Sequence, residues 1–211
     1  MSRRAHALLD WPHLVRFGAL ASVLVAGACG TGRHEADASG RAGSGACACP
    51  EQGTPPLGAA VMAWLSKARS LHHAADLAED RGALDEAARH LDALLAGPRP
   101  SQAAPEIDEV VADTCARLAE LRSRQGSFEA GVADIDRGLA VVRDPNYFRG
   151  HLFEVLGLVR QRQAEALADR GRSAEADRAR DEAIRASLEA VRIQDEVIQG
   201  ALADAGREQD R

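Results

Sequence analysis

Three glycines at a near-constant spacing constrain the fold of this chain more than any other feature. Gly82, Gly126 and Gly171 lie 44 and 45 residues apart, and each separates two segments in which apolar residues recur every three or four positions. This spacing places the apolar side chains on one face of a helix, and a glycine between two such segments indicates a tight turn. The sequence therefore predicts an all-α fold of about three stacked helical hairpins.

The helical region has recognisable limits. Thr54 can cap a first helix that begins at Pro55, and Pro105 is expected to start the second hairpin. Apolar positions continue almost to the end of the chain, so we expect the helical domain to span residues 55–204, followed by a polar tail at 205–211. A domain of this length can bury a continuous core. A chain with only seven aromatic residues that is rich in Ala, Leu, Glu and Arg suits an all-helical fold.

The second half of the first hairpin resembles the second half of a tetratricopeptide repeat (TPR). In residues 81–98, a turn glycine is followed by large and small residues at the spacing of that repeat, and a proline closes the segment. These residues are Gly82, Leu84, Ala87, Leu91, Leu94 and Pro98. Residues 118–141 align in the same way, with the small residues Gly131 and Gly138.

The resemblance covers residues 57–172 and implies a TPR-like α-solenoid in which the small residues let neighbouring helices approach closely. It also implies a surface that binds other proteins. The period exceeds the roughly 34 residues of a typical TPR, so an unrelated helical bundle stays open as an alternative.

The first 28 residues have the order of parts of a signal peptide. Three arginines lead, and an apolar run over residues 17–28 follows them. This run is shorter than the roughly 20 residues that a membrane-spanning helix needs, and small residues precede its end. We therefore expect residues 1–28 to be a signal peptide.

The stretch Val25-Ala26-Gly27-Ala28-Cys29 resembles the lipobox of bacterial lipoproteins. The resemblance implies that Cys29 is diacylated on its sulfur and becomes the first mature residue. The absence of aspartate after Cys29 favours the outer membrane over the inner one. Two alternatives stay open: an ordinary secretory signal, which would leave a soluble periplasmic or secreted protein, and an apolar helix end that is not cleaved.

Residues 29–54 are rich in Gly, Ala and Ser and show no apolar period, which predicts a flexible tether. Cys47 and Cys49 lie in this tether, whereas Cys115 occupies an inward-facing position of the third predicted helix. Zinc sites usually space their thiolates by two to four residues and use four ligands, so the three cysteines are a weak metal signal. A periplasmic metal- or thiol-dependent binding protein that uses Cys47, Cys49 and Cys115 is nevertheless the alternative function.

The sequence carries no phosphate-binding loop, no nucleophile-elbow motif and no zinc-protease motif. We therefore expect no enzyme activity, no cofactor and no metal site. His72, His73 and His90 are expected to be structural or surface residues, because adjacent histidines on a helix point in different directions. Asp134 and Asp136 are expected to be solvated for the same reason.

The segment 146–155 gathers three of the seven aromatic residues. Phe148 and Leu152 lie on the apolar stripe of their predicted helix and are expected to pack between hairpins. Tyr147 and Arg149 are then the members most free to contact a partner, and both residue types are common at binding hot spots.

The chain is acidic, with a formal net charge of −6. Residues 1–28 contain three arginines and one aspartate, so their removal would change the net charge to −8. An acidic chain does not offer the basic face that nucleic acid requires. The sequence therefore favours a membrane-anchored, TPR-like lipoprotein that acts as a non-enzymatic adaptor or assembly factor. Its partner would be an envelope or periplasmic protein. The sequence does not decide its oligomeric state.

Overall fold

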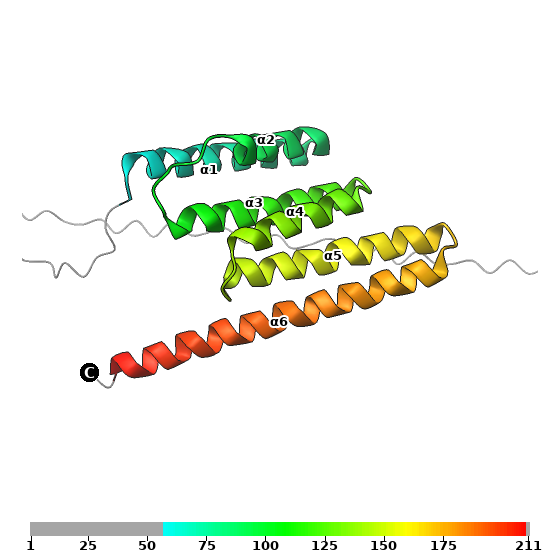
Figure 1. Cartoon of the computed structure of the whole chain (residues 1–211). Coiled ribbons are helices and arrows are strands. Elements are labelled where there is room, and N and C mark those ends of the chain that lie inside the picture. The colour runs from blue at the N-terminus through cyan, green and yellow to red at the C-terminus, as the bar shows by residue number, and fades with distance from the viewer. Residues whose placement is uncertain (1–56, 210–211) are drawn as a thin grey trace, which may run out of the picture. The chain divides into compact units, whose positions relative to one another are not determined.

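The structure is a computed structural model that describes residues 57–209, and every regular element in this range is a helix. The predicted all-α fold of three helical hairpins is confirmed (Figure 1). The six helices of this range are α1 Ala59–Asp80, α2 Leu84–Ala96, α3 Pro105–Arg124, α4 Phe128–Val141, α5 Tyr147–Asp169 and α6 Ser173–Gln209. The hairpins pair α1 with α2, α3 with α4 and α5 with α6.

The three hairpin turns share one backbone geometry. Gly82, Gly126 and Gly171 have φ angles of 74°, 79° and 74°, in the left-handed region that glycine adopts without steric cost. In each turn, the residue after the glycine donates its N–H to the carbonyl five residues earlier, which is the bond of a Schellman helix end. The donors are Ala83, Ser127 and Arg172, at 2.9, 2.8 and 3.0 Å. The sequence period is therefore a structural period.

The first helix of each later hairpin contacts both helices of the hairpin before it. α3 contacts α1 and α5, the first helices of its two neighbours, as well as its own partner α4 and the preceding α2. Within residues 57–209, the second helices α2, α4 and α6 do not contact one another. Among the six described helices, α6 contacts only α5.

Small residues hold α4 close to its neighbours, as the sequence predicts. A Cβ atom added to Gly138 would lie 2.7 Å from Cδ2 of Leu152 and 3.1 Å from Cβ of Cys115. One added to Gly131 would lie 3.0 Å from the backbone oxygen of Ala119. Leu152 and Cys115 are fully buried, so neither has space into which it can withdraw.

Two helix boundaries differ from the sequence expectation. α1 begins at Ala59 with Gly58 before it, whereas Thr54 and Pro55 lie outside the described residues. At the other end, α6 continues to Gln209 and so includes most of the segment 205–211, which was assigned to a polar tail. Charged residues do not stop a helix that is already propagating, because each added residue gains one backbone hydrogen bond.

Arginines of the first helices link each hairpin to the one before it. Arg117 of α3 donates hydrogen bonds to two side chains of α1, and Arg162 of α5, 45 residues later, donates to two side chains of α3. The acceptors are Asp76 and Glu79 for the first arginine, and Glu120 and Ser123 for the second. The two junctions therefore use equivalent positions of the repeat.

No helix within residues 57–209 combines the length and the apolarity that crossing a membrane requires.

Candidate functional site

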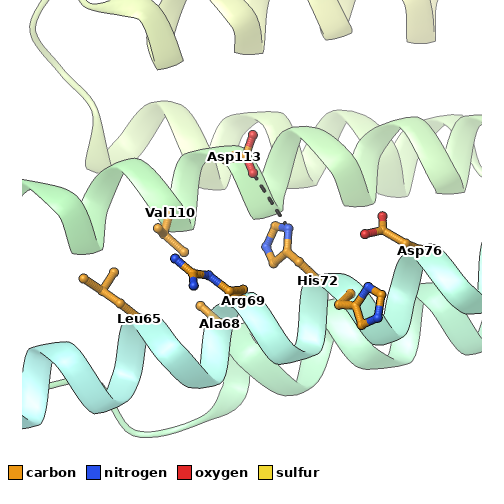
Figure 2. Close-up of a pocket in the computed structure, with 8 residues that line it drawn as sticks. Leu65, Ala68, Arg69, His72, Asp76, Val110 and Asp113 are labelled. Carbon is orange, nitrogen blue, oxygen red and sulfur yellow. Dashed lines mark ion pairs between the residues drawn. The ribbon is translucent and has the colours of Figure 1, made fainter. Parts of the chain in front are cut away.

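An open groove lies between α1 and α3. Its volume is about 670 Å³. Its lining residues are Leu65, Ala68, Arg69, His72, His73 and Asp76 of α1 and Val110 and Asp113 of α3 (Figure 2). The apolar residues are buried or half-buried, whereas Arg69, His73 and Asp76 are exposed. An apolar base with a few polar groups above it is the usual composition of a binding site.

His72 extends from α1 toward α3, and its hydrogen bonds define its tautomer. The hydroxyl of Thr114 donates to the carbonyl of Val110 at 2.6 Å, so this oxygen can only accept from the imidazole. The Nε2 of His72 lies 2.9 Å from that hydroxyl oxygen and must carry the hydrogen. In the neutral ring, Nδ1 is therefore an acceptor.

The imidazole of His72 is neutral at pH 7. Burial lowers the pKa of His72 below its ordinary value and Arg117 adds to this effect, although Asp113 and Asp76 oppose it. The Nδ1 atom lies 3.8 Å from Oδ2 of Asp113, which is too far for a hydrogen bond (Figure 2). The groove therefore presents two hydrogen-bond acceptors side by side, which suits an N–H or ammonium donor on a ligand.

Arg117 fixes one end of the groove. It donates to Asp76 and Glu79, and its Nη1 atom lies 3.4 Å from the backbone oxygen of His72. Arg124 adds a further bond to Glu79, at 2.7 Å. These contacts hold α1 and α3 at a set separation although few apolar side chains meet there.

The histidines that the sequence singled out do not converge. His72 faces α3, whereas the Nε2 of His90 on α2 lies 3.8 Å from Glu86 of the same helix. Of the part of the chain that the structure describes, no three His, Cys, Asp or Glu side chains are arranged to hold a metal ion.

The three cysteines of the alternative function are only partly visible. Cys47 and Cys49 lie outside the described residues, as does Cys29. Cys115 is fully buried in α3, and burial raises the pKa of its thiol to about 11. Cys115 is therefore a neutral thiol at pH 7, which is a poor nucleophile and a poor metal ligand.

The structure separates the roles of Tyr147 and Arg149. Tyr147 is 64% exposed, and its ring stacks on His151 with a centroid distance of 6.0 Å. Arg149 is half-buried, donates from Nη1 to the carbonyl of Val142 at 2.9 Å and lies over the ring of Phe153. Tyr147 is thus free to contact a partner, whereas the guanidinium of Arg149 already holds the α4–α5 connection. Neither residue lines the groove.

The expectation that Asp134 is solvated is wrong. Asp134 is only 5% exposed and accepts a hydrogen bond from Arg122, whereas Asp136 is exposed as expected. Asp134 lies three residues after Gly131, on the same face of α4, and this spacing is the sequence signal that indicates its burial. The other amino group of Arg122 donates to both carboxylate oxygens of Asp92, each at 3.0 Å. One arginine thereby connects α2, α3 and α4.

Comparisons of the chain with protein-family models, with curated proteins and with solved structures found no significant match.

Proposed function

We propose that this protein is a lipid-anchored adaptor or assembly factor of the bacterial cell envelope, without enzyme activity, whose TPR-like hairpins bind another envelope protein. The groove between α1 and α3 is the observation that carries this proposal. It is open, partly apolar and bordered by exposed charged groups, and stacked helical repeats commonly form extended surfaces that bind other proteins.

The chemistry of the groove indicates the kind of segment it takes. An apolar side chain of the partner fits against Leu65 and Val110. A donor beside it, such as a backbone N–H or a lysine, meets the Nδ1 of His72 and the carboxylate of Asp113. Arg69 at the exposed edge offers a cation to an acidic group of the same segment.

The anchor part of the proposal depends on Cys29. Cells fed a fatty-acid label should incorporate it into the wild-type protein but not into the Cys29→Ser variant, because the cysteine sulfur is the attachment point. Cys47→Ser is the matched control and should be labelled like wild type. Equal, background-level labelling of wild type and Cys29→Ser would contradict lipidation.

The adaptor part is tested by crosslinking in intact cells. A photoreactive amino acid at Arg69 or His73, both exposed at the groove, should yield a discrete crosslinked envelope protein. The same reagent at Arg170, an exposed residue of the α5–α6 turn, should not. A photoreactive amino acid at Tyr147 tests whether the exposed start of α5 also contacts a partner.

Leu65→Glu in the groove should lower the crosslinking yield about tenfold, because a charge replaces the apolar contact of a hot-spot position. Leu77→Glu, an exposed residue of the same helix outside the groove, is the matched control. Equal yields from the groove and from Arg170 would reject the groove as the binding site.

A further inference from the structure

Helix α6 has two apolar faces, and other elements within residues 57–209 cover only one of them. The covered face consists of small residues and one isoleucine packed on α5; its buried members are Ala176, Ala179, Ala186, Ala190 and Ile193. The other face carries five large apolar side chains that are each 51–64% exposed. These residues, here called the outer stripe, are Ile184, Leu188, Val191, Ile198 and Leu202.

The outer stripe has the spacing of a helix–helix seam. Its members are separated by four, three, seven and four residues, and Asp195 divides the gap of seven into four and three. Alternation of four and three is the heptad pattern with which two helices pack along their length. At about 100° per residue, the mean direction of the outer stripe lies roughly 130° around the helix from that of the covered face, on the side away from α5.

The end of α6 has no neighbour within residues 57–209. Ile193 is the last buried residue of the helix, yet the helix continues to Gln209 and extends past the start of α5 (Figure 1). Ile198 and Leu202 belong to this extension. A contiguous exposed apolar surface on a folded domain usually marks a contact with another surface.

We propose that the outer stripe binds the outer stripe of a second copy of this chain, with the two α6 helices antiparallel and a two-fold axis near residue 193. In this register, Ile184 lies opposite Leu202 of the second copy, and Leu188 lies opposite Ile198. The extension 197–209 of each copy then packs beside residues 177–189 of the other. Each unsupported helix end thus gains a partner, and the pairing covers roughly 50 Å of helix.

Charge selects the antiparallel orientation. A parallel, in-register pair would place Asp195 against Asp195 of the second copy and Arg180 beside Arg185 at both edges, and such like-charge contacts are unfavourable. The antiparallel pair instead places Asp195 beside Val191 and Arg192 of the other copy. Arg192 bridges Glu189 and Glu196 on its own helix, whereas Asp195 takes part in none of the ion pairs within residues 57–209. The second copy supplies a cation for it, and the two Arg192 side chains that meet near the two-fold axis are each paired with two glutamates of their own helix.

Sedimentation equilibrium of the full chain in density-matched detergent tests the association. Wild type should form dimers, and Leu188→Glu should raise the dimer dissociation constant at least about tenfold, because it places a charge in the apolar seam. Leu188 is 64% exposed, so its replacement should leave the helical circular dichroism unchanged. Leu77→Glu on α1, also an exposed leucine, is the matched control and should dimerise like wild type.

Disulfide crosslinking tests the orientation. Two differently tagged full-length copies are co-expressed, one with Leu188→Cys and the other with Ile198→Cys, in a background where Cys47 and Cys49 are serine. The mixed pair should form a disulfide between the two tags on mild oxidation. Each variant alone should give no more crosslinked dimer than the background without an added cysteine.

Three results would overturn the proposal. A monomeric wild type at about 100 μM, a concentration at which even a weak micromolar dimer assembles, would mean that another chain or the N-terminal segment covers the stripe. A dimer that Leu188→Glu leaves intact would place the interface elsewhere. Self-crosslinking of Leu188→Cys without the mixed product would show a parallel pair.

Discussion

Replacing Arg122 with methionine is expected to destabilise the folded domain by about 3–5 kcal/mol at pH 7. The substitution leaves the carboxylate of Asp134, which is 5% exposed, without its cation, and an uncompensated buried charge costs this much. Methionine keeps most of the apolar stem of arginine. The loss of folding stability therefore reflects the missing charge and not a cavity. Urea denaturation followed by circular dichroism measures the change.

The penalty should shrink as the pH falls. Burial already raises the pKa of Asp134 above its ordinary value, with Arg122 acting in the opposite direction. Removal of Arg122 therefore raises that pKa further. A carboxyl group with a raised pKa in the folded state costs stability once the pH exceeds its unfolded value, and this cost grows until the folded pKa is passed. Near pH 4, about the ordinary pKa of an aspartate, the further raised pKa of Asp134 in the variant keeps its carboxyl group mostly protonated, so wild type and Arg122→Met should differ much less than at pH 7.

The control is the Arg122→Met change in a protein whose Asp134 carboxylate has been replaced by an uncharged amide. In an Asp134→Asn background, Arg122→Met removes only the pair with the half-exposed Asp92, which is worth about 1 kcal/mol or less. A loss of 3 kcal/mol in both backgrounds would show that Arg122 acts through its packing and not through Asp134.

Replacing Gly138 with valine is expected to cost about 3 kcal/mol, at the upper end of the range for overpacked cores. The first added carbon alone would lie 2.7 Å from the buried side chain of Leu152. The same change at Gly200 is the matched control, since an added Cβ there meets nothing within 4 Å. Gly200→Val should alter the free energy of unfolding by less than about 0.5 kcal/mol, because valine exceeds glycine only slightly in helix propensity. Equal losses of stability at the two glycines would show that helix propensity, and not packing against Leu152, determines the effect.

The hairpins were predictable from the sequence because their determinants are local. An apolar period of three to four residues sets each helix, and a left-handed glycine sets each turn. Pro105 starts α3 as expected, and the three turn glycines lie where the pattern put them. The close approach at Gly131 and Gly138 was also predictable, because a small residue on an apolar face leaves room for a neighbouring backbone.

The groove was not predictable because it depends on contacts between residues that are distant in the sequence. His72 is hydrogen-bonded to Thr114, 42 residues away, and the tautomer of His72 depends on the hydroxyl of Thr114 donating its hydrogen to Val110. The buried state of Asp134 depends in the same way on Arg122 of another helix. The sequence showed the apolar positions of α6 up to Leu202, but periodicity does not distinguish a covered face from an exposed one.

The equivalent junctions at Arg117 and Arg162 make this architecture extensible. The two arginines are 45 residues apart, and their acceptors follow the same period, since Asp76 and Glu120 are 44 residues apart, as are Glu79 and Ser123. The α3–α4 hairpin carries both the arginine and the acceptors, so a tandem duplication of this hairpin would place Arg117 of the second copy beside Glu120 and Ser123 of the first. Gene duplication alone can set the length of such an array, and only its last helix needs a distinct outer face.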